Sequence, residues 1–285
     1  ISLFEDENEI RWIGTSGAGL NFMTVSNNSF FKITDSLNHI GEIIFSITKS
    51  QEKNTILVSG SRGLSKVEIQ TKKINPINYR LENEKEENTN ITLCTYEDKL
   101  GNLWIGTEGN GLYYFDVNTQ RSTKYSIADG LPNEVIYSIL PDDNNNLWLS
   151  TNKGLSRLNL ETKQFKNIDV YDGILENEFN YGSRIKLKNN ELMFGSANGI
   201  VYFNPKDINE NSFIPPVYIT SILVNNKPYL SGINLNKTIK LNHNQNVFSF
   251  SFIALSYSQP EKNQYAYKLE GFDKDWNYIK YKKFA

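Results

Sequence analysis

The chain has 285 residues with 30 basic and 32 acidic side chains, a formal net charge of -2 at pH 7, and one cysteine. A near-neutral chain has no basic footprint for nucleic acid, and no apolar run approaches the roughly 18 residues of a membrane-spanning helix. The lone Cys94 excludes a disulfide framework and a multi-cysteine zinc site. We therefore expect no nucleic-acid partner, no cofactor and no metal site.

A four-residue string recurs along the first two hundred residues. Its copies begin at Trp12, Leu57, Trp104, Trp148 and Met193, at spacings of 45, 47, 44 and 45 residues. A Gly-Leu or Gly-Ile pair follows each copy within eight residues. A fixed period of about 40 to 50 residues is typical of propeller blades and solenoid units.

One period contains four short strand patterns. In the fourth repeat they cover residues 135–140, 147–150, 155–160 and 165–170, and polar or glycine-containing turns separate them. Four antiparallel strands per period predict a propeller blade. No segment has a helical period over ten residues, so we expect an all-β fold with about five four-stranded blades, as part of a larger propeller.

The recurring tryptophan and the small residue two positions later have a structural explanation. Trp12, Trp104 and Trp148 would fill the space between facing blades, and small residues such as Gly14 and Gly106 would let the next blade approach closely. We expect these tryptophans to be buried and not to bind a ligand.

The period fails near residue 212, where two prolines at 215 and 216 interrupt strand pairing. We assign residues 1–211 to the propeller and residues 212–285 to an Ig-like β-sandwich. Strand patterns at 217–224, 239–241, 247–252 and 265–269 are fewer than the seven or so strands of a complete sandwich. The second module is therefore expected to be incomplete, and the chain to be a piece of a longer polypeptide.

The repeats resemble the two-component regulator propeller repeat, on residues 101–107 (GNLWIGT) and 129–133 (DGLPN). Residues 247–276 are similar to the Y_Y_Y domain that follows such propellers. The chain departs from the repeat at Leu57 and Met193, which replace tryptophan, and it has fewer blades than the family's usual propellers.

This resemblance implies the periplasmic, extracytoplasmic sensor region of a hybrid histidine kinase and response regulator, common in gut Bacteroidetes. Many such proteins recognise oligosaccharides and regulate polysaccharide utilisation genes. It further implies an oligosaccharide ligand and a homodimer formed through the C-terminal domain. The kinase and the attachment to the membrane would lie in segments outside these residues, so the segment itself would not be an enzyme.

Ligands of propellers bind over the loops that join consecutive blades, because these loops converge at the axis. Side chains that offer a stacking surface and a bidentate donor gather at the junction of the fourth and fifth repeats. The candidate ligand-binding residues are Tyr171, Asp172, Glu178, Asn180, Tyr181 and Arg184.

Two other functions remain open. A propeller glycosidase or lyase would need a pair of carboxylates about 5 to 10 Å apart, and Asp169, Asp172, Glu176 and Glu178 are available. A protein-binding scaffold would use the propeller faces. Residues 142–146 begin like a calcium loop, but Leu147 stands where that loop needs glycine and Lys153 where it needs glutamate.

Overall fold

The computed structural model describes residues 2–24, 29–34, 39–81, 91–208, 215–231, 239–256, 260, 263–280 and 282–284. The chain divides into two compact units, Ile1–Ile208 and Asn209–Ala285. The boundary expected between residues 211 and 212 lies outside the described residues and stays a prediction.

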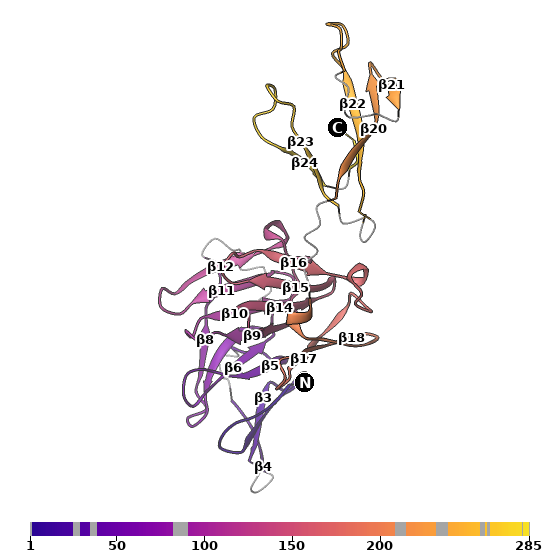
Figure 1. The fold of residues 1–285 in the computed structure, drawn as a ribbon. Helices are drawn as coiled ribbons and strands as arrows, with labels where there is room; N and C mark the ends of the chain where they lie inside the picture. The colour runs from indigo at the N-terminus through magenta and orange to yellow at the C-terminus, as the bar shows by residue number, and fades with distance from the viewer. Residues whose placement is uncertain are drawn as a thin grey trace. The chain divides into compact units, whose positions relative to one another are not determined.

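The first unit consists of five antiparallel sheets, which we number blades 1 to 5 (Figure 1). Consecutive strands are hydrogen-bonded neighbours within every blade. Blade 1 contains β1 (Ser2–Glu5), β2 (Ile10–Gly14), β3 (Leu20–Thr24) and β4 (Ser29–Lys32). Blade 2 contains β5 (Ile44–Lys49), β6 (Thr55–Gly60), β7 (Gly63–Glu68) and β8 (Ile74–Ile77). Blade 3 contains β9 (Thr92–Glu97), β10 (Leu103–Thr107), β11 (Leu112–Asp116) and β12 (Arg121–Tyr125).

Blade 4 contains β13 (Ser138–Pro141), β14 (Asn146–Thr151), β15 (Gly154–Asn159) and β16 (Phe165–Ile168). Blade 5 contains β17 (Phe179–Lys186), β18 (Leu192–Ser196) and β19 (Gly199–Phe203). Short 3-10 turns, η1 (Ile127–Asp129), η2 (Val170–Asp172) and η3 (Pro205–Asp207), follow β12, β16 and β19. The expectation of all-β propeller blades is confirmed.

Two details differ from the predicted strands. Blade 5 has three strands in the described part of the chain, because η3 begins at Pro205, which has no N–H to donate to a further ladder. The first strand of blade 4 begins at Ser138 instead of residue 135, because the preceding residues bond to blade 3. Ile136 N–H donates to the carbonyl of Thr107, and Val135 forms a bridge with Glu108.

The glycines of the Gly-Leu pairs have a positive φ, and two of them, Gly154 and Gly111, also lack room for a side chain. Gly154 has a φ of 92°, and a Cβ on it would lie 2.2 Å from the carbonyl oxygen of Ile168. Gly111 has a φ of 76° and meets the carbonyl of Tyr125 in the same way. Only glycine fits these positions, which explains why the pair recurs in the sequence.

The blades pack face to face through four apolar cores. In three of these cores a tryptophan lies in one cluster with an apolar side chain of the next blade: Trp12 with Ile56, Trp104 with Leu149, and Trp148 with Phe194. Trp12, Trp104 and Trp148 are 0%, 1% and 0% exposed, which confirms that they are structural. In blade 2, Leu57 takes the tryptophan position and packs with Ile105 of blade 3 in the fourth core.

Gly14 and Gly106, two positions after Trp12 and Trp104, lie where the next blade approaches closely. A Cβ on Gly14 would lie 2.6 Å from Ile44 Cγ2 of blade 2. A Cβ on Gly106 would lie 2.5 Å from Cys94 Sγ and 2.9 Å from Ile136 Cγ2, next to blade 4. Both distances are shorter than carbon atoms tolerate, so the expected close approach is confirmed.

The second unit has a three-stranded sheet in the order β21-β20-β22 and a separate hairpin. Its strands are β20 (Val217–Val224), β21 (Lys227–Ser231), β22 (Phe248–Ala254), β23 (Tyr265–Tyr267) and β24 (Asn277–Lys280). The expected strand at 239–241 is wrong, because these residues form no ladder, whereas β24 was not predicted. The described strands agree with an incomplete β-sandwich.

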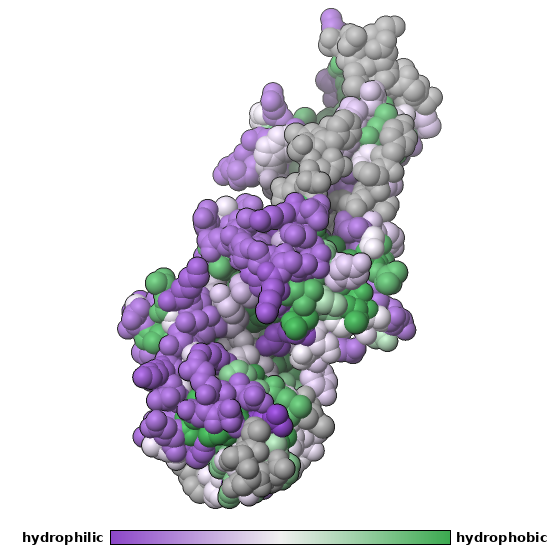
Figure 2. Space-filling view, turned by 60° about the horizontal axis from the view of Figure 1, so that its bottom comes forward, coloured by the Kyte–Doolittle hydropathy of each residue, from purple (hydrophilic) through white to green (hydrophobic). Residues whose placement is uncertain are grey.

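The surface has the polarity that the charge content implies. On the face shown in Figure 2, hydrophilic side chains predominate and the hydrophobic ones form separate patches. No helix in the described ranges is long and apolar enough to cross a membrane.

Candidate functional site

The predicted residues 180–184 lie on an irregular part of β17. Phe179 pairs with Ser196 and Arg184 pairs with Phe194, so four residues of β17 stand opposite Gly195 alone. Gly182 within this bulge has a φ of 71°, a conformation that glycine adopts readily. The bulge interrupts the ladder between β17 and β18, and β17 also packs against β13 of blade 4, β9 of blade 3 and β5 of blade 2 (Figure 1).

Two predicted residues on β17 contact blade 2 across this junction. The Tyr181 ring meets the Phe45 ring edge-on, with centroids 5.7 Å apart, and remains half exposed. Arg184 Nη2 donates to Ser46 Oγ over 3.3 Å. We call the group formed by Phe45, Ser46, Tyr181 and Arg184 the axial site. It combines an aromatic corner with a guanidinium and a hydroxyl.

The charge of Arg184 also reaches blade 3. Burial raises the pKa of the Cys94 thiol to about 11, and the nearby positive charge of Arg184 opposes this increase. Cys94 is completely buried and its Sγ lies 3.5 Å from the carbonyl oxygen of Ile136. A thiol with so high a pKa is protonated at neutral pH, so Cys94 is a packing residue and not a nucleophile.

Glu178, another predicted residue, lies beside a tyrosine from blade 4. The pKa of Tyr137 is raised, first by burial and then by the negative charges of Glu178 and Glu108. The carbonyl of Glu178 accepts from Ala197 N–H, and Asn180 Nδ2 donates to the carbonyl of Ser196. The Glu178 carbonyl and the Asn180 side chain therefore hold the start of β17 to the hairpin between β18 and β19.

The structure gives Tyr171 and Asp172 a different setting. Both belong to η2, whose cap is reciprocal: Asp169 Oδ1 accepts from Tyr171 N–H, and Asp172 Oδ2 accepts from Asp169 N–H. The Asp172 carboxylate thus shapes the loop between blades 4 and 5. The Tyr171 side chain is 64% exposed and offers a ring to solvent on that loop.

Sequence reasoning missed Phe45, Ser46 and Tyr137. A signal was present, because the ladders place Ser46 opposite Ser59 and Ser138 opposite Ser150. Phe45 and Tyr137 therefore occupy the same repeat position, one residue before the serine on the innermost strand. The signal is weak, because the same position holds Ile1 in blade 1 and Leu93 in blade 3.

The acidic residues considered for metal binding and catalysis have structural partners. Asp142 Oδ1 accepts two backbone N–H groups of its turn, and Oδ2 accepts from Trp148 Nε1. The pKa of Glu176 is lowered, mainly by the side chain of Asn198, which donates to its carboxylate. No group of three or more metal-ligating side chains occurs in the described ranges.

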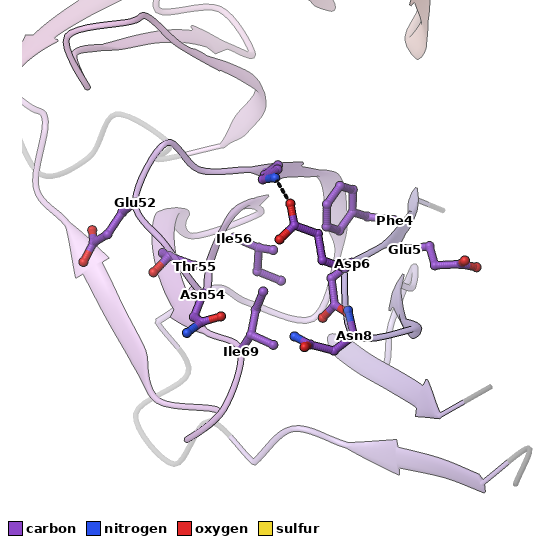
Figure 3. A pocket seen from close by; sticks show the side chains of 11 residues that line it. Phe4, Glu5, Asp6, Asn8, Glu52, Asn54, Thr55, Ile56 and Ile69 are labelled. Carbon is purple, nitrogen blue, oxygen red and sulfur yellow. Dashed lines mark hydrogen bonds and ion pairs between the residues drawn. The ribbon is translucent and has the colours of Figure 1, made fainter. Parts of the chain in front are cut away.

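A pocket of about 300 Å³ lies between blades 1 and 2 (Figure 3). Phe4, Ile56 and Ile69 supply its apolar wall, and acidic and amide side chains such as Asn8 and Asn54 face it. Its carboxylates are engaged: Glu7 pairs with Lys49, and Asp6 accepts from Trp12 Nε1. None of the predicted site residues lines this pocket.

The second unit has a larger and more open pocket of about 710 Å³. It is lined by one face of β22, with Phe248, Phe250 and Phe252, and by the hairpin side, with Tyr267 and Phe272. A mostly apolar lining of this kind is what an incompletely covered sandwich core presents.

Comparison with known proteins is consistent with this architecture. A model of the two component regulator propeller family matches residues 85–109 and 130–153. Histidine kinase P4 of Formosa agariphila is 29% identical over 96% of this chain, which spans 21% of that protein. The chain thus has about a fifth of the length of this relative.

Solved structures match over the whole chain. The extracellular domain of the putative hybrid two component system BT3049 from B. thetaiotaomicron is 28% identical, with a TM-score of 0.77, over 99% of this chain and 39% of that one. The extracellular domain of BT4673 from the same organism is 22% identical, with a TM-score of 0.62, over 100% of this chain and 51% of that one, and shares the fold. The chain therefore matches the two component regulator propeller model over two short segments and is similar, over nearly all its length, to the extracellular domain of a putative hybrid two component system.

Proposed function

We propose that this chain is part of the periplasmic sensing region of a hybrid histidine kinase and response regulator, and that it recognises an oligosaccharide. The observation that carries the proposal is the similarity to the BT3049 extracellular domain over 99% of the chain. The kinase, the membrane attachment and the control of polysaccharide utilisation genes would belong to other parts of the protein.

The chemistry of the axial site supports a sugar ligand. The half-exposed Tyr181 ring offers a flat apolar face, and Arg184 offers a planar donor on the same bulge. Glu178, next to the bulge, adds a carboxylate that can accept hydrogen bonds from sugar hydroxyl groups. Sugars are recognised by such combinations of an aromatic face and planar polar groups, because they expose both C–H and O–H surfaces.

Signalling would require that the ligand favour one arrangement of the receptor over another. The β17 bulge is suited to this, because Arg184 of blade 5 bonds to Ser46 of blade 2, 138 residues earlier in the sequence. A ligand that orders Tyr181 and Arg184 would hold these blades together. The homodimer expected through the C-terminal domain would then pass the change on.

The test uses the purified 285-residue chain and a panel of defined neutral and acidic oligosaccharides. Binding is measured by calorimetry and by the increase in the unfolding midpoint, which depends on ligand concentration and affinity. We expect Tyr181→Ala and Arg184→Gln to abolish the increase. Tyr202→Ala, which removes another exposed tyrosine of blade 5, is the matched control and should bind normally. No binding by any oligosaccharide would overturn the proposal.

The same samples discriminate the alternatives. Turnover of a bound oligosaccharide, lost in Glu178→Gln, would favour a glycosidase or lyase. The lowered pKa of Glu176 is the opposite of what a general acid needs. A stable protein partner without any glycan effect would favour a scaffold.

A further inference from the structure

The outermost hairpins of blades 2, 3 and 4 share one turn. The turns cover residues 68–72, 116–120 and 159–163. In each of these five-residue turns, the fourth residue is threonine and the fifth has a positive φ. The fifth residues are Lys72, Gln120 and Lys163, with φ values of 60°, 56° and 59°. Lys72 N–H donates to the carbonyl of Glu68, and Lys163 N–H donates to the carbonyl of Asn159, both over 2.9 Å. The turn thus presents the side chain of its fifth residue in the same way each time.

In blades 2 and 4, this side chain reaches an aromatic pair of the preceding blade. Lys72 Nζ lies 4.5 Å from the ring centroid of Trp12 and 4.4 Å from that of Phe22. Lys163 Nζ lies 5.3 Å from the Trp104 centroid and 5.7 Å from that of Tyr114. These distances are within the range of cation–π attraction.

A carboxylate of the preceding blade acts on each lysine. Burial lowers the pKa of Lys72 and of Lys163, and the charges of Asp6 and Asp98 respectively oppose the decrease. Asp6 Oδ2 also accepts from Trp12 Nε1 over 2.8 Å. The ammonium is therefore stabilised by a ring face and by a negative charge from the same preceding blade.

Between blades 2 and 3, all three positions differ together. In the turn between the first two strands, blade 2 has Ser50 where blades 1 and 3 have Asp6 and Asp98. On the next strand it has Leu57 in place of tryptophan. The hairpin of blade 3 correspondingly carries the neutral Gln120, whose Nε2 donates to the carbonyl of Val117 over 2.7 Å. An ammonium over an aliphatic side chain would lose hydration without gaining a partner, so the glutamine suits this neighbour.

We propose that the residue at the fifth hairpin position and the aspartate and tryptophan of the preceding blade form a matched set that determines which blades pack together. A blade with aspartate and tryptophan recognises a following blade whose hairpin carries lysine. A blade with serine and leucine recognises one with a neutral hairpin residue. Blade 5 has no such hairpin in the described residues, and Phe203 covers Trp148 there with ring centroids 4.7 Å apart.

The first experiment removes the charge and keeps the side-chain length. Lys72→Met in the full chain should lower the unfolding midpoint of the propeller unit by about 2 °C. Lys72→Arg, which keeps the positive charge, should have the midpoint of the natural chain. In a Trp12→Leu background, Lys72→Met should cause a smaller loss, because Phe22 and Asp6 remain as partners of the ammonium. A midpoint unchanged by Lys72→Met, or equal losses in both backgrounds, would overturn the proposal.

The second experiment introduces the charge where the set lacks it. Gln120→Lys should lower the unfolding midpoint, whereas Gln120→Met should leave it within about 1 °C. These variants sit on an exposed turn, so folding is not at risk. If Gln120→Lys is as stable as Gln120→Met, the hairpin residue does not discriminate between neighbours and the proposal fails.

Discussion

At the scale of single residues, the carboxylate of Asp142 connects a turn to a core. Its Oδ1 accepts from Asn144 N–H and Asn146 N–H, and its Oδ2 accepts from the indole of the buried Trp148 over 2.9 Å. Buried donors without acceptors lose the hydration that they have in the unfolded chain. Asp142 therefore accepts hydrogen bonds both from backbone N–H groups of the turn and from a tryptophan of the core.

We predict that Asp142→Ala lowers the free energy of unfolding by about 1–3 kcal/mol, because four donors, including the side-chain amide of Asn146, lose their acceptor. Urea denaturation followed by tryptophan fluorescence measures the change. Glu161→Gln, which alters an exposed carboxylate of the same blade, should stay within about 0.5 kcal/mol. Equal effects of the two substitutions would contradict the role of Asp142.

Cys94 makes a pH-dependent contribution to stability. Its folded pKa of about 11 exceeds the ordinary value of 9.0, so folding favours the protonated thiol. The contribution is fully present below pH 9 and is lost as the pH increases from about 9 to 11. Denaturation at a series of pH values should show a steeper loss for the natural chain than for Cys94→Ala. Parallel curves would refute this prediction.

At the scale of the strands and hairpins, the inner ladder sets the distance between blades. Gly106 lies where a side chain would strike Cys94 and Ile136. Ser150 has the corresponding position in blade 4, and its Oγ has no hydrogen-bond partner. The same repeat position thus tolerates a small side chain in one blade and none in another.

We predict that Gly106→Ala destabilises the propeller unit by about 1–3 kcal/mol through overpacking. Ser150→Ala should be neutral or slightly stabilising, because it removes an unpaired buried hydroxyl. Thermal unfolding of both variants tests the pair. A Gly106→Ala variant as stable as Ser150→Ala would show that blades 3 and 4 can move apart.

At the scale of the whole molecule, the propeller and the second unit have separate cores. The four inter-blade cores lie within residues 1–208, whereas the second unit buries Ile222, Val224, Ala254 and Tyr265. Two units with their own cores can unfold independently.

We therefore predict two calorimetric transitions for the 285-residue chain, with the propeller unit giving the larger enthalpy because it has more residues. A chain of residues 1–208 should keep that transition at an unchanged midpoint. A single transition in the full chain, or loss of folding in the shorter chain, would show that the units depend on each other.

The blades follow from local and periodic features of the sequence. Strand length, turn residues and the spacing of Trp12, Trp104 and Trp148 are local or periodic, and burial of these side chains follows from the alternation within each strand. The close approach at Gly14 and Gly106 could be predicted for the same reason.

The contacts between residues of different blades could not be predicted from these local features. Tyr181 and Arg184 contact Phe45 and Ser46 because a bulge redirects β17, and a bulge leaves no periodic mark in the sequence. The pairing of Lys72 with Trp12, 60 residues earlier, likewise depends on how one blade faces the next. Contacts between distant segments are fixed by packing, whereas the pattern within each repeat fixes only the segments themselves.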